Sequence, residues 1–340
     1  MSDTDHRPPK HPPTQTPTHP PTTPDQLTPL LDLLTADQIL TTAWSEPVWA
    51  VPRLLPTGLT ILAGQPKLGK SWLALQIAHA VAAGGHALGE SVDKGPILYL
   101  ALEDSPRRLK ERMARQGWPP GLPADFMPLG QFTRQIDDLR DGGGERLAAH
   151  IERVGYRLVV IDTLSRSCYG DQNDVEQMTS ALTPLQEMAH AKNCAVLMVD
   201  HHRKGFGLNP DAVGDILGST AKGAMADSIW GLYKNKNRKG ARLAVTGRDI
   251  EERTLALTMD WLTGCWQLEG DADELEMTQR RQEILDALDM LGRAGVVDIA
   301  TAIEQPKSHT HTRLQDLVDA GLVLRNKKAN RVYYELPQEE

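Results

Sequence analysis

The sequence predicts an α/β fold with a mainly parallel sheet flanked by helices, antiparallel strands at the edge of that sheet, and a small C-terminal winged-helix domain. From Leu59 onward, short and almost continuously apolar runs alternate with longer helical patterns, which is typical of buried parallel strands joined by helices. After Asp215, four apolar runs follow one another without helices between them and indicate antiparallel strands. Residues 277–336 give three helices and then two strands, the order of a winged helix.

The N-terminal part of the chain has the composition of a tail. Residues 1–25 contain eight prolines and many threonines, with almost no apolar side chains. Such a segment cannot bury enough surface to offset its loss of conformational entropy, so we expect it to be disordered. Residues 26–50 have leucines at helical spacing as far as Ile39, and they predict a short helical segment followed by a connector.

The rest of the composition is that of a globular protein. Of the 340 residues, 40% are hydrophobic and 24% are charged, and this length suggests one large domain and a smaller one. No apolar run reaches the roughly 20 residues of a membrane span, and no secretory signal is present, so we expect no membrane partner. The three cysteines, Cys168, Cys194 and Cys265, are widely spaced and favour a reducing cytoplasm over a disulfide framework or a metal site. The net charge of -8 argues against a protein that coats nucleic acid, but it allows a local basic patch.

The α/β domain is expected to span residues 51–270. Apolar runs predict its parallel strands at residues 59–63, 95–102, 157–162 and 194–200. Helical patterns follow these runs at residues 70–83, 106–116, 144–154 and 175–192, with a connection rich in proline and glycine after the second helix. The edge strands are expected at residues 228–234, 241–249, 254–260 and 265–270.

An acidic linker is expected at residues 271–276, before a winged helix at residues 277–336. The run RRQEILDALDML predicts an amphipathic helix. The runs VVDIATAIE and SHTHTRLQDLVDAGLV predict two more helices joined by a tight turn, with Ser308 as an N-cap. The run LVLRNKKANRVYYEL predicts two strands around a basic turn.

The segment GQPKLGKS, residues 64–71, matches G-x-x-x-x-G-K-[ST] between a predicted strand and a predicted helix. Its glycines let backbone N–H groups point at phosphate oxygens, and the helix dipole favours the same anion. Lys70 is expected to contact the β- and γ-phosphates, and the Ser71 hydroxyl to bind Mg²⁺. A glycine-rich turn without a ligand is the alternative. The residues expected to bind ATP are Gly64, Gln65, Pro66, Lys67, Leu68, Gly69, Lys70, Ser71, Trp72 and Asp162.

Two acidic residues at the ends of other strands complete the expected chemistry. Asp162 ends the run RLVVID and is expected to anchor Mg²⁺, although an aspartate here could also cap a helix. Glu103 ends the run ILYLALE and is a candidate base to orient and deprotonate the attacking water. The alternatives are that Glu103 is ordinary surface charge, or that Asp104 is the base.

A histidine pair ends the strand run CAVLMVD. His201 and His202 are expected at the carboxyl edge of the sheet, in the same crevice as Asp162. Adjacent residues of a strand point to opposite faces, and no Cys or His partner lies nearby, so a metal site is a poor interpretation. A γ-phosphate sensor fits better, and a solvated histidine pair is the alternative.

The motifs occur in the order Walker A, glutamate, Walker B aspartate and histidine sensor, and this order resembles that of the RecA-like ATPases rather than AAA+ proteins. LTILAGQPKLGKSWLALQIA, ILYLALEDSPRRLKER, LVVIDTLSR, DHHRK and LGSTAKGAMADSIW are similar to segments of hexameric plasmid replicative helicases of the RepA type, over about residues 50–265. The resemblance implies a RecA-like P-loop NTPase fold and ring hexamers that hydrolyse ATP at subunit interfaces and move along single-stranded DNA. It also implies that Glu103 is the catalytic base and His202 the γ-phosphate sensor.

The sequence departs from this family at the arginine finger, which would align near Trp230. A finger is expected because an Arg inserted from a neighbouring subunit stabilises the charge that develops on the γ-phosphoryl group. The candidates are Arg248 in VTGRD, which we favour, and Arg238 in KNKNRKG. Either residue could instead be ordinary surface charge.

Two regions are candidates for DNA binding. The resemblance implies that residues 165–174 and 203–218 form loops that face the ring channel. Arg203 and Lys204 in the second loop could bind backbone phosphates of single-stranded DNA. The wing RNKKANR contributes Arg325, Lys327, Lys328 and Arg331, which suit duplex DNA. Asp316 and Asp319 weaken the case for a reader of the deep groove, and a protein-docking role is the alternative.

The sequence therefore predicts an ATP-dependent DNA helicase or translocase that acts in the replication of a plasmid, phage or integrative element. The expected cofactors are ATP and Mg²⁺, and the expected partners are DNA, further copies of the chain and a separate primase. A RecA-like recombinase or regulatory ATPase without unwinding activity is the nearest alternative. A replication initiator or transcription regulator switched by ATP is another, and a small-molecule kinase is the least favoured.

Overall fold

The computed structural model describes residues 33–44, 46–170, 174–201, 220–235, 240–328 and 331–337. The chain divides into two units, Met1–Glu46 and Pro47–Glu340. In the first unit, the short helix α1 (Ala36–Thr41) begins at a capping box formed by Thr35 and Gln38. No helix in the described part of the chain combines the length and the apolar character needed to cross a membrane.

Nine described strands of the second unit form one sheet. They are β3 (Gly58–Gly64), β6 (Ile97–Ala101), β7 (Ala124–Pro128), β8 (Leu158–Asp162), β9 (Ala195–His201), β10 (Ser228–Lys234), β11 (Ala241–Gly247), β12 (Arg253–Asp260) and β13 (Cys265–Asp271). Their spatial order is β13-β12-β11-β10-β3-β9-β8-β6-β7. The pairs from β10 to β7 are parallel, and the pairs from β10 to β13 are antiparallel. The predicted fold class is thereby confirmed, with β7 as an additional parallel strand within the connection that is rich in proline and glycine.

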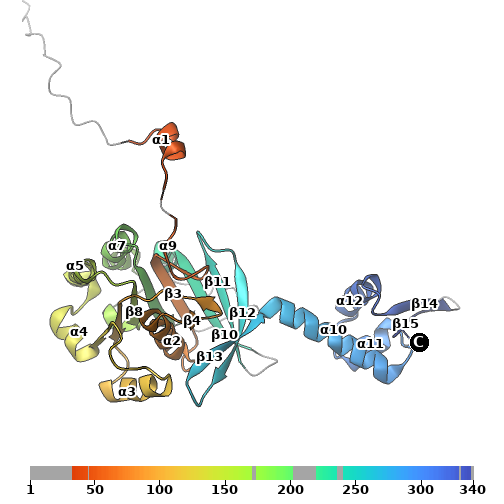
Figure 1. Cartoon of the computed structure of the whole chain (residues 1–340). Helices are drawn as coiled ribbons and strands as arrows, with labels where there is room; N and C mark the ends of the chain where they lie inside the picture. The colour runs from red at the N-terminus through yellow and green to blue at the C-terminus, as the bar shows by residue number, and fades with distance from the viewer. Residues whose placement is uncertain are drawn as a thin grey trace, which may run out of the picture. The chain divides into compact units, whose positions relative to one another are not determined.

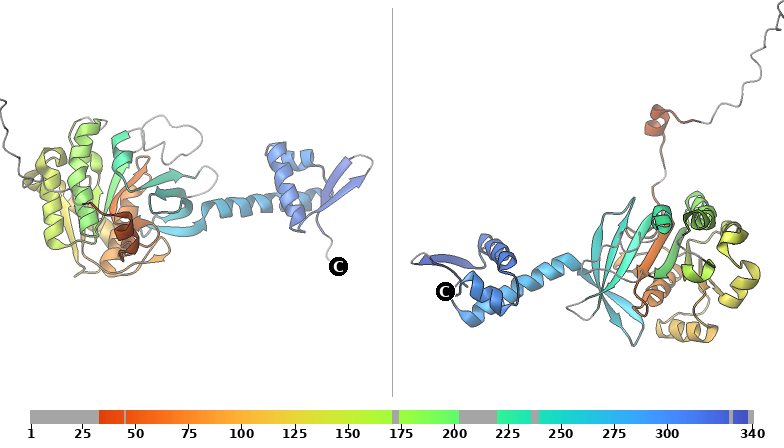
Figure 2. Two further views of the ribbon diagram at one scale, coloured as in Figure 1. Left: turned by 90° about the horizontal axis from the view of Figure 1, so that it is seen from above. Right: turned by 180° about the vertical axis from the view of Figure 1, so that it is seen from behind.

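Helices cover both faces of this sheet (Figures 1 and 2). One face packs against α2 (Lys70–Ala83) and α3 (Pro106–Arg115), around Leu73, Ile77 and Leu109. The other face packs against the remaining helices of the domain. They are α4 (Leu129–Gln135), the kinked turn η1 (Leu139–Gly143), α5 (Gly144–Val154), α6 (Leu164–Ser167), α7 (Val175–Ala191) and α9 (Thr220–Met225). The parallel strands β3, β6, β8 and β9 are buried on both faces, which is why the sequence shows them as continuous apolar runs.

Two small hairpin-like pairs flank the sheet. β1 (Trp49–Val51) pairs with β2 (Leu55–Pro56), and β4 (His86–Ala87) pairs with β5 (Glu90–Ser91). Arg53, between the first two strands, forms an ion pair with Glu90 at 2.6 Å. The contact joins the two pairs of strands at the surface.

The C-terminal domain has the predicted winged-helix order. α10 (Ala272–Leu291), α11 (Val296–Ala302) and α12 (Lys307–Asp319) are followed by the antiparallel strands β14 (Leu324–Lys328) and β15 (Arg331–Glu335). Its separate core includes Ile284, Leu288, Ile299, Leu314 and Tyr334.

Two expectations for this domain are wrong. Ser308 is not an N-cap, because α12 already begins at Lys307 and the carbonyl of Pro306 accepts the first helical hydrogen bond, from the Thr310 amide. The acidic residues 271–276 are not a linker, because α10 begins at Ala272 directly after β13. Acidic residues suit the first turn of a helix, where the positive end of the helix dipole favours them.

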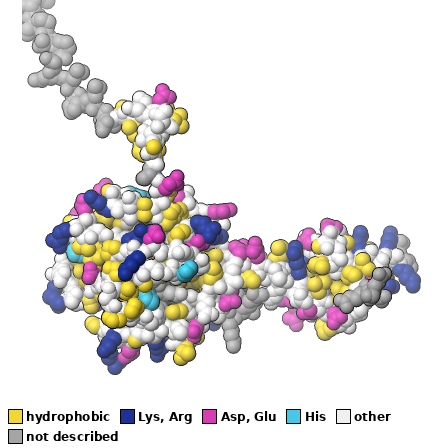
Figure 3. All heavy atoms as spheres, viewed as in Figure 1, with side chains coloured by type: hydrophobic (Ala, Val, Ile, Leu, Met, Phe, Trp, Pro, Cys, Tyr) yellow, Lys and Arg dark blue, Asp and Glu magenta, His cyan; other side chains and the backbone are white. Residues whose placement is uncertain are grey.

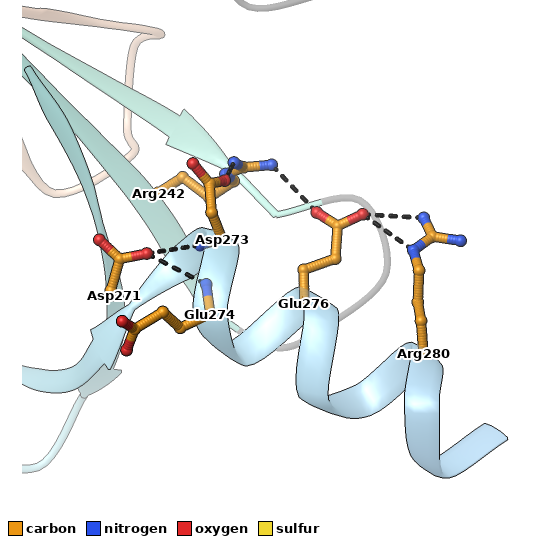
Figure 4. Close-up of polar contacts among 6 residues, drawn as sticks. All are labelled: Arg242, Asp271, Asp273, Glu274, Glu276 and Arg280. Carbon is orange, nitrogen blue, oxygen red and sulfur yellow. Dashed lines mark hydrogen bonds and ion pairs between the residues drawn. The ribbon is translucent and has the colours of Figure 1, made fainter. Parts of the chain in front are cut away.

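The start of α10 is held to the sheet by charged side chains (Figure 4). The carboxylate of Asp271, the last residue of β13, accepts hydrogen bonds from the amides of Asp273 and Glu274. Arg242 on β11 forms ion pairs with Asp273 at 2.7 Å and with Glu276 at 3.5 Å. Arg280, one turn further along α10, forms an ion pair with Glu276 at 2.8 Å. One residue, Asp271, therefore ends the sheet and caps the helix.

Candidate nucleotide-binding site

The glycine-rich loop lies between the end of β3 at Gly64 and the start of α2 at Lys70. Gly69 has φ of 100°, in the left-handed region that favours glycine. Trp266 on β13 lies against this loop, because its indole N–H donates to the Gly69 carbonyl at 3.1 Å. A Cβ on Gly69 would lie 2.9 Å from the same indole ring. The loop conformation therefore requires glycine at this position, and a residue far along the chain supports it.

The Lys70 ammonium lies within the loop. Its Nζ donates to the carbonyls of Gly64 at 2.7 Å and Gln65 at 3.0 Å, and it lies 3.4 Å from His201 Nδ1. The side chain is buried, and this burial lowers the lysine pKa, while the nearby carboxylates, led by Asp162, oppose the decrease. A cation at this point of the loop can bind phosphate oxygens.

Asp162 ends β8 and is only 3% exposed. Its carboxylate accepts hydrogen bonds from the Ser71 hydroxyl at 3.1 Å and from the Tyr99 hydroxyl at 2.8 Å. Burial raises its pKa to about 6, and the two hydrogen bonds limit the increase. Tyr99 is absent from the sequence prediction. The available signal was a tyrosine within the apolar run of β6, because a buried tyrosine hydroxyl needs a partner.

The oxygen atoms at this point suit magnesium. The Ser71 hydroxyl and the Asp162 carboxylate are hard ligands, and Mg²⁺ is usually held by one or two such groups together with substrate phosphates. The described residues contain no cluster of three or more His, Cys, Asp or Glu side chains able to hold a metal by themselves. The donor set therefore fits a metal ion that arrives with a nucleotide.

Glu103 and Asp104 follow β6 but differ in their surroundings. Glu103 is 37% exposed, accepts a hydrogen bond from the Thr163 hydroxyl at 3.1 Å, and lies 3.7 Å from His201 Nε2. Asp104 is 8% exposed and forms ion pairs with Arg108 and Arg112. Because two guanidinium groups bind the Asp104 carboxylate, Glu103 is the better placed of the two to act as a base.

His201 is the last residue of β9 and pairs in register with Gly64. Its ring nitrogens lie 3.4 Å from Lys70 Nζ and 3.7 Å from the Glu103 carboxylate. One histidine of the predicted pair thus lies between the loop lysine and the candidate base. The other, His202, lies outside the described residues, as do Arg203, Lys204 and Arg238.

A cavity of about 340 Å³ adjoins the loop. Trp72 and Trp261 are among the residues that line it, and Trp261, on the turn between β12 and β13, is 63% exposed. The Arg112 guanidinium stacks on the Trp72 ring at 5.0 Å. Gly264 on the same turn contacts Trp72 so closely that a Cβ would collide with the ring. Trp261 and Arg112 are absent from the sequence prediction, because they reach the loop from distant segments.

Arg248 lies at the other edge of the sheet. Gly247 pairs with Ser228, which pairs with Thr60 near the start of β3, whereas the loop follows Gly64 at the end of β3. Four residues of strand, about 13 Å, separate these two levels of the sheet. The Arg248 guanidinium is 62% exposed and lies 3.4 Å from the Asp227 carboxylate.

Trp230, where the finger would align, is a core residue. Its side chain is fully buried on β10, and its indole N–H donates to the Leu54 carbonyl at 3.2 Å. A side chain enclosed in this way cannot reach a second subunit.

The basic residues of the wing are exposed. Arg325, Lys327 and Lys328 lie on β14, and Arg331 begins β15 directly opposite Lys328. Lys and Arg side chains gather over this end of the C-terminal domain (Figure 3). Arg325, Lys327, Lys328 and Arg331 thus form one basic hairpin, as the sequence predicts.

Comparisons with known proteins agree with this architecture. The AAA domain family profile matches residues 23–206, and the IclR helix-turn-helix domain profile matches residues 279–327. The DNA repair protein RadA of Streptococcus pneumoniae is 24% identical over 155 residues, which cover 44% of this chain and 31% of that protein. RadA of Mycobacterium tuberculosis is 27% identical over 198 residues, 57% of this chain and 35% of that protein. The chain therefore spans about a third of the length of these relatives.

Solved structures with partial similarity include a RadB recombinase and a KaiC-like protein from Pyrococcus horikoshii. The first has a TM-score of 0.44 and 18% identity, and the match covers 62% of this chain and 90% of that one. The second has a TM-score of 0.44 and 14% identity, and the match covers 66% of this chain and 98% of that one.

Proposed function

This chain belongs to the AAA domain family, and on that premise we propose that it is an ATP-dependent DNA helicase or translocase that hydrolyses ATP between neighbouring copies of itself. The resemblance of its motifs to RepA-type helicases supports a ring, six-membered in that family, that acts with a separate primase in replicating a plasmid, phage or integrative element. The glycine-rich loop, the Ser71–Asp162 pair and the basic wing support ATP, Mg²⁺ and DNA as its ligands.

Each residue of the site has a separate role in this proposal. The loop amides and Lys70 bind the β- and γ-phosphates, and Ser71 and Asp162 hold Mg²⁺, which neutralises phosphate charge when bound. Glu103 accepts a proton from the attacking water. His201, between Lys70 and Glu103, is the histidine that we assign to the γ-phosphate, and His202 remains the residue named by the resemblance.

The position of Arg248 carries the proposal that a neighbouring copy completes the site. The side chain lies at the edge of the sheet opposite its own loop and is bound to Asp227, so it is too far away to contact its own nucleotide. An exposed arginine at that edge is available to the nucleotide of an adjacent subunit, where it would stabilise charge on the γ-phosphoryl group. Residue 238, the second candidate, is outside the described part of the chain.

Mixed oligomers test this assignment. Lys70→Ala and Arg248→Ala subunits should each be inactive alone, because one lacks the phosphate-binding cation and the other lacks the finger. In an equimolar mixture, some sites take their glycine-rich loop from an Arg248→Ala subunit, which has Lys70, and their finger from a Lys70→Ala neighbour, which has Arg248. These sites regain both groups. Random mixing predicts recovery of roughly a quarter of wild-type ATP turnover.

The matched control is a mixture of Lys70→Ala and Glu103→Gln subunits. No interface between these two contains both an intact loop and an intact base, so the mixture should stay inactive. An inactive Lys70→Ala/Arg248→Ala mixture, or an Arg248→Ala protein with wild-type turnover, would contradict a role for Arg248 in trans.

Strand separation tests the helicase itself. The wild type should hydrolyse ATP faster with single-stranded DNA and should separate a forked duplex, while Lys70→Ala should do neither. Turnover without strand separation would rule out the helicase.

The RadA relatives favour a second function, a recombinase or regulatory ATPase that does not unwind DNA. Electron microscopy distinguishes the two, because closed rings with ATP support the helicase and open filaments support the recombinase. The match to the IclR helix-turn-helix domain favours a third function, an initiator in which ATP only switches assembly. A sequence-specific DNA footprint that survives Glu103→Gln would support the initiator.

A further inference from the structure

Asp200 and Lys222 form a buried ion pair beside the nucleotide site. The Lys222 ammonium donates to Asp200 Oδ2 at 2.6 Å, and the two side chains are 7% and 9% exposed. Asp200 is the penultimate residue of β9, and Lys222 lies on α9. The pair thus joins the strand that ends in His201 to a helix that begins 19 residues after that strand.

Stability alone is a poor reason for such a pair. Removing two charges from water costs several kcal/mol for each ion, and the attraction between the two charges often does no more than offset this cost. The second oxygen of the carboxylate indicates a more specific role. Asp200 Oδ1 accepts a hydrogen bond from the backbone amide of His201 at 2.8 Å. Two donors, one on each oxygen, therefore fix the orientation of the Asp200 carboxylate.

The His201 ring lies close to two groups of the site. Its Nδ1 is 3.4 Å from Lys70 Nζ, and its Nε2 is 3.7 Å from the Glu103 carboxylate. A small rotation of the His201 backbone would change both distances. Misplacement of a reacting group by about 1 Å can lower a rate by about 100-fold.

We propose that Lys222 is a positioning residue for ATP hydrolysis, which acts through Asp200 to hold His201 against Lys70 and Glu103. The proposal rests on the ATPase function proposed above. Lys222 is not among the residues that line the cavity beside the loop, and its 2.6 Å contact with the Asp200 carboxylate is the path by which we expect it to act on His201.

A double-mutant cycle with His201 tests the path. Lys222→Met should lower kcat for ATP about 10-fold and leave KM within about 2-fold, because the nucleotide is bound by other residues. Lys222→Arg, which keeps the charge and the donors, should recover part of kcat. In a His201→Ala protein, Lys222→Met should cause no further loss, because the residue through which it acts is absent.

Two further variants separate positioning from folding. Lys222→Met leaves the buried Asp200 charge without its partner and could unfold the chain, whereas Asp200→Leu/Lys222→Met removes both charges and should fold with the same low kcat. Arg157→Met is the matched control. Arg157 lies just before β8 begins. The substitution breaks its 3.0 Å ion pair with Asp93 and its hydrogen bond to the Trp49 carbonyl, and it should leave kcat unchanged.

The outcomes are distinct. An equal loss from Lys222→Met in the wild-type and His201→Ala backgrounds would overturn the inference, as would an Asp200→Leu/Lys222→Met protein with normal kcat. Both results leave the ATPase function standing. A wild type that binds but never hydrolyses ATP would overturn the proposed function and the positioning role with it.

Discussion

Replacing Asp162 by Asn should stabilise the protein in the absence of nucleotide while removing a ligand for Mg²⁺. The carboxylate is 3% exposed, and its burial raises the pKa to about 6 from an ordinary value of 3.8. Folding therefore disfavours the ionised form. The protonated carboxyl makes its full contribution to the free energy of unfolding below about pH 4, and this contribution is lost as the pH rises through about 6.

The size of this effect follows from the two pKa values. They differ by about 2.2, and at 1.36 kcal/mol per pKa unit the ionised side chain lowers the free energy of unfolding by about 3 kcal/mol above pH 6. An asparagine carries no charge, and its amide can still pair with the hydroxyls of Ser71 and Tyr99. We therefore expect Asp162→Asn to gain about 1–3 kcal/mol at about pH 8 and almost nothing at about pH 4.

Urea unfolding without metal or nucleotide, measured from about pH 4 to about pH 8, gives this difference directly. Tyr99→Phe is the matched variant, because it removes a hydrogen bond that lowers the Asp162 pKa, and it should lose stability at high pH. Mg²⁺ and ATP should stabilise the wild type more than Asp162→Asn. An Asp162→Asn protein that is less stable than the wild type at about pH 8, or equally shifted at every pH, would refute the reasoning.

Three further variants test other parts of the chain. Glu103→Gln should abolish ATP turnover in a steady-state assay, whereas Asp104→Asn should retain most of it because its partners are arginines; the opposite result would make Asp104 the base. Gly69→Ala should cost about 1–3 kcal/mol in urea unfolding, because a Cβ at φ 100° meets the Trp266 ring, and an unchanged midpoint would contradict this geometry. Duplex binding can be measured by fluorescence anisotropy at several salt concentrations. Neutralising the four basic residues of the wing should reduce the slope of log K against log[salt] by up to about 3.6. Arg293→Ala is the control and should leave the slope unchanged, because Arg293 is paired with Glu335. An unaltered slope in the wing variant, Arg325→Ala/Lys327→Ala/Lys328→Ala/Arg331→Ala, would remove DNA from the ligands of the hairpin.

The parts of the site that could be predicted are those written in local sequence. The glycine-rich motif is a run of eight residues from the last residue of β3 into the start of α2, and it can be recognised from those residues alone. Asp162 and Glu103 follow apolar runs, and parallel strands bring their carboxyl ends to one edge of a sheet. The order of the strands and motifs in the sequence therefore predicted that Asp162, Glu103 and the glycine-rich loop lie at the same edge of the sheet.

Tyr99 and Trp266 could not be assigned in the same way. A tyrosine within an apolar strand has the pattern of a core residue, and only the register of β6 against β8 brings its hydroxyl to Asp162. Trp266 lies 197 positions from Gly69, and the contact between them depends on the packing of β13 against α2. Such contacts are set by tertiary structure, which a single sequence does not encode as a pattern.

The error at residues 271–276 has a local cause. A run of acidic residues after a strand has the composition of a solvated linker, but it also has the charge preferred at the start of a helix. Asp271 capped the helix, and Arg242 on the sheet paired with Asp273. The composition of these residues fits both interpretations, and the N-cap Asp271 belongs to the same run.

The absence of a spacer after Asp271 constrains how this chain can be re-engineered. β13 supports the glycine-rich loop through Trp266 near one end and passes directly into α10 at the other. Each residue inserted at that junction would rotate everything downstream by about 100° and advance it by about 1.5 Å. A chimera that exchanges the C-terminal domain must therefore preserve the helical phase of α10, since a shift would move Asp273 and Glu276 away from Arg242 on the sheet.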